Sequence, residues 1–494
     1  MTAAGTTSRP GMSLTIPPRR TDAVPALAAL PVAIIGAGPV GLAAAADLRE
    51  RGIDCIVFEA GAAAGSAIAL WGHTRLFSPW RYLTSAASVR LLEPTGWVAP
   101  DPDVVPSGDE LLADYVRPLA AVLSDRVRFN AQVTAVSRQG MDRTRSANRA
   151  ATPFVLRVET DVGTHDALAR AVIDTSGTYS TPNPLTASGL DLVPRAHDDS
   201  ALQKHLVHAL PDVLGTERSR FAGRHTVVVG AGHSAANTLL ALADLASAEA
   251  GTTISWLIRT ATPVRVYGAD DDELAARASL GSRVQALVTS GQVALITGFE
   301  IDDLALTPDP VTVSTTGPRN LPGSGSGDAR IALIGRRGGV SARLEADLVV
   351  AATGFRPDLA MLREIRLSLD EIVEAPRLLA PLIDPNLHSC GTVPAHGVDV
   401  LTHPEPNFYL AGMKSFGRAP TFLLATGYEQ VRSIADELAG NRAAARLVTL
   451  VLPETGVCCT TPPAAPTDTI SPAAPMPALV PAALPPAASA ACCT

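Results

Sequence analysis

Two glycine-rich segments of the same type can hold phosphates in this chain. Each follows a short run of β-branched apolar residues, the first at Gly36-Ala37-Gly38-Pro39-Val40-Gly41 and the second at Gly230-Ala231-Gly232-His233-Ser234-Ala235. In such a motif one glycine turns the chain, a second lets backbone N–H groups approach a pyrophosphate, and a third lets the helix pack against the strand. Two dinucleotide sites in one chain favour hydride transfer from a nicotinamide to a flavin.

The first motif has every neighbour that a dinucleotide site requires. An apolar strand is predicted over 32–35, a helix follows the glycines, and a second strand over 55–58 ends at Glu59. A carboxylate at this position suits the hydroxyl groups of a ribose. The alternative is a glycine-rich turn without a ligand.

The second motif ends differently, because the strand predicted over 253–258 is followed by Arg259 and not by an acid. A guanidinium at that place can hold a 2′-phosphate, which favours NADPH over NADH. The alternative is a solvated arginine at the end of a strand. Ala235 stands at the third glycine position, which is a permitted variant.

Length and composition limit the class of protein. A chain of 494 residues should form at least two domains, and 47% hydrophobic with 18% charged residues is typical of a globular protein. The net charge of −8 leaves no electrostatic footprint for nucleic acid or anionic lipid. The apolar run 23–46 is long enough for a membrane span, but its glycines and prolines argue against one. We therefore expect a cytoplasmic protein without a nucleic acid or membrane partner.

Aromatic residues gather between 71 and 97, although only 4% of the chain is aromatic. Cover for a flat ring and ordinary core packing are equally good explanations. Further along, a helix is predicted over 108–123, and strands are predicted near 127–136 and 154–160. Two related segments follow, Val172 to Gly177 and Leu348 to Pro357, each an apolar strand that ends in small residues. Small residues there let the backbone pass close to a cofactor.

The order of these motifs over roughly residues 30 to 440 resembles that of the two-dinucleotide flavoproteins. This superfamily contains flavin-containing monooxygenases, thioredoxin reductases and the larger disulfide reductases. The resemblance implies an α/β fold with two Rossmann-like three-layer nucleotide-binding domains, the NADPH domain being inserted into a discontinuous FAD domain. The expected parts are a disordered leader over 1–28, FAD-binding segments over 29–200 and 353–445, an NADPH-binding domain over 223–352, and a disordered Pro- and Ala-rich tail over 446–494.

The resemblance also implies the residues that contact FAD and NADPH. Those for FAD are Gly36, Ala37, Gly38, Pro39, Gly41, Glu59, Ala60, Ser66, Trp71, Val133, Gly412, Met413 and Thr421. Those for NADPH are Gly230, Gly232, His233, Ser234, Ala235, Arg259, Thr353 and Gly354.

Two departures favour the monooxygenase branch of the superfamily. Reductases usually carry an acid directly after the C-terminal glycine, whereas Met413-Lys414 follows Gly412 here. A dithiol reductase also needs two thiols against the flavin, normally in a CxxC or CxxxxC loop, and the sequence contains neither. Against that branch, the monooxygenase pattern of Phe, Gly and spaced His is also absent before the second glycine-rich motif.

The six cysteines divide into two kinds. Cys55 lies in a predicted strand and belongs to the core, while Cys390 lies in a loop-rich stretch. The tail carries two vicinal pairs, Cys458-Cys459 and Cys492-Cys493. Adjacent cysteines close an awkward disulfide ring, so each pair is available as a ligand for thiophilic ions such as Hg(II), Cu(I) or As(III). Low-complexity sequence with incidental cysteines is the alternative.

A narrower resemblance rests on the segments Gly412 to Phe422 and Thr426 to Val431 and on Leu-Pro-Glu-Thr-Gly-Val-Cys in the tail. These segments look like flavoproteins of bacterial arsenic-resistance operons. That resemblance implies a three-thiol set of Cys390 and a tail pair, which suits trivalent arsenic.

We expect hydride to pass from NADPH to flavin N5, and electrons to continue to O₂ or another small acceptor. His73 and Cys390 are candidates for the second half of this reaction because they flank the FAD motifs, as are His388 and His396, although each has a structural alternative. Three hypotheses remain: a monooxygenase-like oxidoreductase, a thiol or metalloid reductase with a cysteine shuttle, and a metalloid-binding or sensing flavoprotein. The expected partner is a small molecule or metalloid, and a homodimer is compatible with each.

Overall fold

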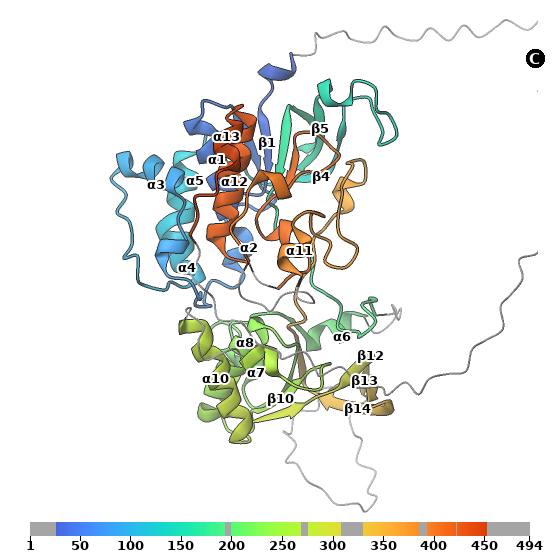
Figure 1. Ribbon diagram of the computed structural model, residues 1–494. Coiled ribbons are helices and arrows are strands. Elements are labelled where there is room, and N and C mark those ends of the chain that lie inside the picture. Colours follow the sequence, from blue (N-terminus) through green and yellow to red (C-terminus); the bar gives the residue numbers. More distant parts are fainter. Residues whose placement is uncertain are drawn as a thin grey trace, which may run out of the picture. The chain divides into compact units, whose positions relative to one another are not determined.

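The computed structural model describes residues 26–192, 199–267, 275–307, 330–384, 393–420 and 422–451. Two parallel sheets of five strands dominate these residues (Figure 1). The first sheet has the order β16-β7-β1-β2-β3. Its strands are β1 (Val32–Ile35), β2 (Cys55–Phe58), β3 (Val127–Arg128), β7 (Ala171–Asp174) and β16 (Phe408–Leu410).

The second sheet has the order β11-β10-β9-β15-β8, which repeats the plan of the first sheet when it is read from β8 to β11. Its strands are β8 (Leu206–His208), β9 (His225–Val229), β10 (Thr253–Leu257), β11 (Val293–Ile296) and β15 (Leu348–Ala351). Because the two orders correspond strand by strand, β1 matches β9 and β7 matches β15. Strand β8 lies in residues that the sequence analysis left unassigned, since three residues carry too short a hydrophobic pattern to be recognised.

A three-stranded antiparallel sheet is inserted into each parallel sheet along the chain, between β3 and β7 in the first and between β11 and β15 in the second. The first consists of β4 (Ala131–Arg138), β5 (Phe154–Thr160) and β6 (Gly163–Ala169). The second consists of β12 (Phe299–Thr307), β13 (Arg330–Arg337) and β14 (Val340–Ala346).

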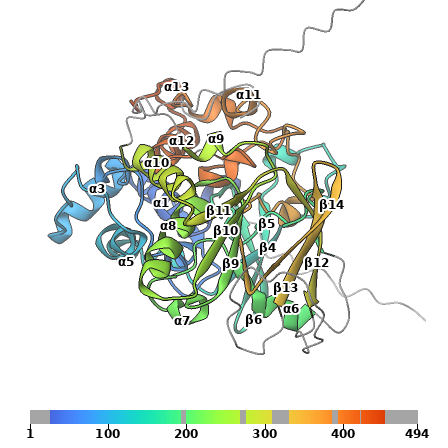
Figure 2. The same ribbon diagram turned by 90° about the horizontal axis from the view of Figure 1, so that it is seen from below.

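Both fingerprints begin long helices, as predicted. Helix α1 (Pro39–Glu50) follows β1, and α8 (His233–Ala248) follows β9. Helix α1 packs against α12 (Leu424–Leu438), which comes from the far end of the chain (Figure 1). In the second unit α8 and α10 (Ala275–Thr289) lie beside β9, β10 and β11 (Figure 2).

The remaining helices are short. They are α2 (Ser66–Ala69), α3 (Ala86–Leu92), α4 (Gly108–Leu111), α5 (Arg117–Val122), α6 (Asp199–His205), α7 (Arg218–Phe221), α9 (Val264–Tyr267), α11 (Ala380–Ile383) and α13 (Arg442–Arg446). The helix predicted over 108–123 is present, with a π-helical stretch at Leu112–Val116 between α4 and α5. Within the described ranges, no helix combines the length and apolarity needed to cross a bilayer.

The strands that carry the fingerprints are buried on both faces, which explains their uniformly apolar sequences. Every residue of β1 and β7 is buried, and so are four of the five residues of β9. The α/β prediction with two Rossmann-like units is therefore confirmed.

Candidate functional site

The first fingerprint loop is shaped by close backbone packing. Gly36 has φ +97°, a conformation that residues with a side chain rarely adopt. A Cβ at Gly41 would lie 2.0 Å from the carbonyl oxygen of Gly36 and 2.6 Å from Oγ1 of Thr175. Helix α1 can therefore approach the strand edge only because position 41 has no side chain.

Glu59 holds this loop from the end of β2. Its Oε2 accepts the N–H of Ala37 at 2.7 Å, and its Oε1 accepts the N–H of Gly61 at 2.9 Å. The N–H of Gly65 in turn donates to the carbonyl of Ala37 at 3.1 Å. The carboxylate predicted to bind a ribose thus lies against the fingerprint, and each of its oxygens can accept a further hydrogen bond.

The loop fits a bound pyrophosphate. No atom comes within 4 Å of the Cβ direction of Gly38, which is the N-cap of α1. No side chain caps α1, and Pro39 occupies its first turn. The first turn of a helix presents N–H groups and the positive end of its dipole, which is the chemistry that a phosphate requires.

The second fingerprint has the same construction. A Cβ at Gly230, whose φ is +133°, would lie 2.0 Å from the carbonyl oxygen of Ala352, and the space beside Gly232 is open. Trp256 donates from Nε1 to the carbonyl of Gly230 at 2.8 Å. Arg259 follows β10 and is exposed, and it donates from Nη1 to the carbonyl of Ala187 at 3.4 Å. Its guanidinium is therefore accessible to a phosphate.

The other predicted NADPH residues lie around this turn. His233 and Ser234 form the first positions of α8, and Ala235 is fully buried. Thr353 and Gly354 follow β15, where Thr353 Oγ1 donates to the carbonyl of Asn183 at 2.7 Å. The two segments that leave the parallel sheets are thus hydrogen-bonded to each other.

The third segment of the first unit, after β16, is fixed by buried polar groups. The N–H of Gly412 donates to Oε1 of Gln430 at 2.8 Å. Gln430 donates from Nε2 to Ser415 Oγ at 2.9 Å and to Nε2 of His396 at 2.8 Å. Nδ1 of His396 lies 3.0 Å from the carbonyl of Pro394 and therefore carries the proton. Burial lowers the pKa of His396, so this imidazole is neutral and serves to orient Gln430.

Three polar residues that the sequence analysis did not assign to the site form a closed ring next to it. Lys414 donates from Nζ to Asp174 Oδ2 at 2.7 Å and to Ser176 Oγ at 2.9 Å. Ser176 donates from Oγ to Asp174 Oδ1 at 2.7 Å. The side chains of Lys414 and Asp174 are fully buried. The sequence signal for this ring was a lysine inside an apolar motif. Its partner Asp174 could not be identified from the sequence, because it stands 240 positions away.

The remaining predicted residues have simpler surroundings. Ser66 begins α2 and donates to the carbonyl of Ala63, and Trp71 and Met413 are half-buried. Ala60 and His73 are exposed, and Val133 is buried in β4. Cys55 is buried in β2, as predicted, and burial raises the pKa of its thiol to about 12. Thr421, Cys390, Cys458, Cys459, Cys492 and Cys493 lie outside the described residues, as does His388.

Among the described residues, no group of three or more His, Cys, Asp or Glu side chains could hold a metal ion. The predicted tail ligands belong to the part of the chain that the structure does not describe.

Comparison with known proteins identifies a family. A family model described as pyridine nucleotide-disulphide oxidoreductase matches residues 33–322, a span that contains both fingerprints. No curated protein sequence matches the chain.

Solved structures share the fold at low sequence identity. Bacillithiol disulfide reductase Bdr (YpdA) from Bacillus cereus is 21% identical, with 84% of this chain and 99% of that chain covered and a TM-score of 0.59. The FAD-bound cadaverine monooxygenase DfoA from Erwinia amylovora is 12% identical, with coverages of 86% and 98% and a TM-score of 0.54. The Kutzneria sp. 744 ornithine N-hydroxylase KtzI, with reduced FAD and NADP⁺, is 15% identical, with coverages of 84% and 99% and a TM-score of 0.52. The predicted cofactors, FAD and NADPH, are borne out by this family and these relatives.

Proposed function

Because the chain belongs to the pyridine nucleotide-disulphide oxidoreductase family, we propose that it is an FAD-dependent enzyme that oxidises NADPH and reduces O₂ or a small substrate. FAD lies on the first fingerprint and NADPH on the second, with Arg259 selecting the 2′-phosphate. When bound, FAD accepts the two electrons of NADPH and delivers them to the acceptor. The chain's own residues bind and orient the two dinucleotides.

The surroundings of Cys55 are the observation that favours a small, diffusing molecule as the electron acceptor. It is the one cysteine among the described residues, it lies in the hydrophobic core, and its raised pKa keeps it protonated and unreactive. The sequence has no CxxC or CxxxxC loop elsewhere. Without a dithiol in the FAD unit, electrons leave for a small molecule, as in the monooxygenase branch.

The test is anaerobic reduction followed by mixing with O₂. We expect the flavin absorbance of the purified protein to bleach with NADPH, and more slowly with the same concentration of NADH. Addition of O₂ should restore the absorbance, and coupled turnover should consume O₂ without an equal release of H₂O₂. Failure of NADPH to bleach a bound flavin would exclude this function.

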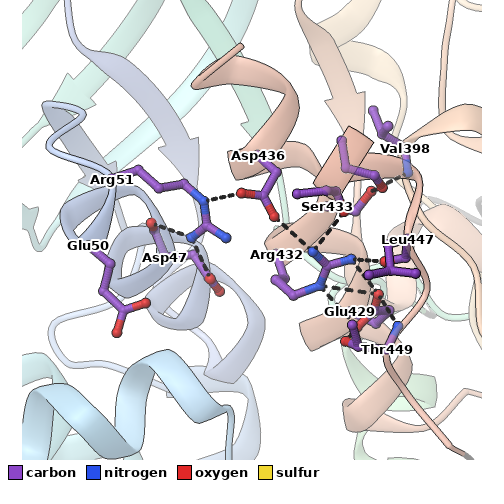
Figure 3. Close-up of polar contacts among 12 residues, drawn as sticks. Asp47, Glu50, Arg51, Val398, Glu429, Arg432, Ser433, Asp436, Leu447 and Thr449 are labelled. Atoms are coloured by element: carbon purple, nitrogen blue, oxygen red, sulfur yellow. Dashed lines mark hydrogen bonds and ion pairs between the residues drawn. The ribbon is translucent and has the colours of Figure 1, made fainter. Parts of the chain in front are cut away.

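One observation favours a second candidate, a metalloid reductase that uses the tail cysteines as a shuttle. The first residues of the tail are held on α12: Thr449 donates from its N–H and Oγ1 to Glu429 at 3.2 and 2.9 Å, and Arg432 donates to the carbonyl of Leu447 at 2.6 Å (Figure 3). Cys458 follows Thr449 by nine positions, a span of about 30 Å when fully extended. Arsenate is the proposed substrate: two electrons of NADPH reduce As(V) to As(III), and the vicinal thiols bind that trivalent product.

A truncation after Val451 separates the two candidates. Removal of everything after Gly440 would also delete α13, whose Ala445 is fully buried, so the shorter deletion is the cleaner one. We expect NADPH oxidation to persist without the tail under the first candidate. Loss of arsenate-dependent NADPH oxidation, in the truncation and in a variant with Cys458→Ser and Cys459→Ser, would support the shuttle.

A further inference from the structure

The ring of Asp174, Ser176 and Lys414 requires an explanation beyond folding. A buried ion pair is seldom a net source of stability, because the desolvation of two charges offsets their attraction. Lys414 and Lys204 are the chain's two lysines, whereas every other basic side chain among its 40 Lys and Arg residues is arginine. One of these two lysines is thus placed in the core, where its side chain has no exposed surface.

The ring lies at the edge of the sheet where a dinucleotide binds. Asp174 is the last residue of β7 and is paired in register with Ile35 on one side and Leu410 on the other. The carboxyl ends of parallel strands are the ligand-binding edge of such sheets. Thr175, the next residue, donates from Oγ1 to the carbonyls of Ile35 and Gly36 at 2.8 and 3.3 Å. The ring therefore adjoins the first fingerprint and the segment after β16.

The second parallel sheet shows that the charge is not part of the shared plan. In that sheet Ala351 occupies the place of Asp174, since it is paired with Val229 as Asp174 is with Ile35. The two units share the strand order, the glycine fingerprint and the apolar strand that ends in small residues. Only the first unit has a buried ion pair at this position. The charges are thus specific to the unit proposed to hold FAD.

We propose that Lys414 is a positioning residue for FAD. Lys414 neutralises Asp174, and it holds the segment Val172 to Gly177 and the segment after β16 in the geometry that binds the flavin nucleotide. This inference rests on the proposed FAD site. The ammonium has three donors, of which Asp174 and Ser176 take two. Lysine suits this place because it is a compact point charge, whereas the wider guanidinium of arginine requires planar partners.

The opposite charges of Lys414 and Asp174 lead to a prediction that a purely structural role would not give. Lys414→Met leaves a buried carboxylate beside the proposed FAD site, which would disfavour the electron-rich reduced form and move the flavin midpoint potential to a more negative value. Asp174→Asn leaves a buried ammonium and moves the potential in the opposite direction. Removal of both charges in Lys414→Met with Asp174→Asn should return the potential close to that of the unmodified protein.

The experiment measures FAD affinity and midpoint potential in the full chain. The unmodified protein and every variant are measured at one pH, because flavin reduction takes up protons and the midpoint potential therefore falls as pH rises. Each single variant should also bind FAD ~10-fold more weakly or worse. Lys204→Met is the matched control, because it removes the other lysine at an exposed position, and both values should stay unchanged.

The outcomes separate this inference from the proposed function. Unmodified protein that binds no FAD would overturn the proposed function and this inference together. FAD-replete protein whose variants keep the same affinity and potential would overturn the role of Lys414 alone. Equal shifts of the same sign in both single variants would show a merely structural role. If Lys414→Met does not fold, the comparison of Asp174→Asn with the double variant still tests the role of Lys414. Their midpoint potentials must differ, because only Asp174→Asn keeps the buried ammonium.

Discussion

Arg51, the C-cap residue of α1, donates from Nε to Oδ1 of Asp436 on α12 at 2.7 Å, a contact between residues 385 positions apart that joins the two helices (Figure 3). Its Nη1 also donates to Asp47 Oδ1 at 2.9 Å. On the other side of Asp436, Arg432 donates from Nη1 to Oδ2 at 2.8 Å. This network connects the helix of the first fingerprint to the helix that follows the last segment of the unit.

Replacement of Arg51 by Met should lower the free energy of unfolding by about 2 kcal/mol, because it takes the guanidinium away from Asp47 and leaves Arg432 as the remaining arginine on Asp436. The value is below that of a fully buried pair, since 16% of the Arg51 side chain is exposed. Urea denaturation of the protein measures it. Glu50→Gln is the control: its partner Arg90 is 58% exposed, so a loss under 1 kcal/mol is expected. Equal losses in both variants would contradict this account.

Glu405 should be the most sensitive ion-pair position in the first unit. Its Oε1 accepts Arg138 Nε at 2.8 Å and its Oε2 accepts Arg149 Nε at 2.9 Å, with both Glu405 and Arg138 side chains fully buried. Burial works against the ionised form, but hydrogen bonds from Arg149 and Arg138 outweigh it and lower the pKa of Glu405. Glu405→Gln should therefore lower the free energy of unfolding by about 3 to 5 kcal/mol.

Chemical denaturation tests this loss against Asp166→Gln. The exposed pair of Arg157 with Asp166 should contribute under about 1 kcal/mol, because solvent screens both groups. A Glu405→Gln protein as stable as the Asp166→Gln protein would contradict the expected loss of stability at Glu405.

His403 should make the protein less stable in acid. Its Nδ1 accepts the N–H of Ser368 at 3.2 Å, its Nε2 is buried without a hydrogen-bond partner, and burial lowers its pKa to about 4. Between about pH 6.5 and 4 the unfolded chain binds a proton that the folded protein excludes, so stability falls as pH falls. The loss from this group is on the order of 3 kcal/mol. His403→Phe should flatten this part of the stability profile, and an unchanged profile would contradict the assignment.

The two open glycines should separate the two cofactors. Gly38 has φ −76° and Gly232 has φ −116°, and both have free space where a Cβ would lie, so alanine fits the protein without a cofactor. The new methyl group of Gly38→Ala should weaken FAD by ~10-fold or more, because the backbone can no longer approach the pyrophosphate. Gly232→Ala should weaken NADPH and leave FAD unchanged.

Equilibrium binding with thermal melting of the cofactor-free proteins checks both variants. Each serves as the control of the other. Loss of both cofactors in one variant, or a lower melting temperature without cofactor, would show that the methyl group disturbs the fold.

Arg259→Ala should convert a preference for NADPH into indifference. Under the proposed function the exposed guanidinium binds the 2′-phosphate, so loss of this charged hydrogen bond should raise KM for NADPH by ~10-fold or more while KM for NADH stays constant. Steady-state oxidation of both nucleotides measures the ratio. Arg157→Ala, which removes an exposed arginine from β5, should change neither value.

The fingerprints could be predicted because their information is local. Gly36, Gly38 and Gly41 stand within six residues, and their roles follow from the backbone geometry that a strand, tight turn and helix require. The same holds for Cys55, whose apolar neighbours in the strand indicate burial. Strand β8 could not be predicted, since its three residues join a sheet only through pairing with Val349 to Ala351.

By itself, the sequence determined that this protein has two units of one plan, and that Glu59 follows the first fingerprint where Arg259 follows the second. Only the tertiary structure decided that Lys414 neutralises Asp174, that Gln430 holds Gly412, and that Arg51 joins Asp436. The physical reason is that local patterns select turns and strands, whereas the partner of a buried charge is selected by the packing that brings distant segments out of water together.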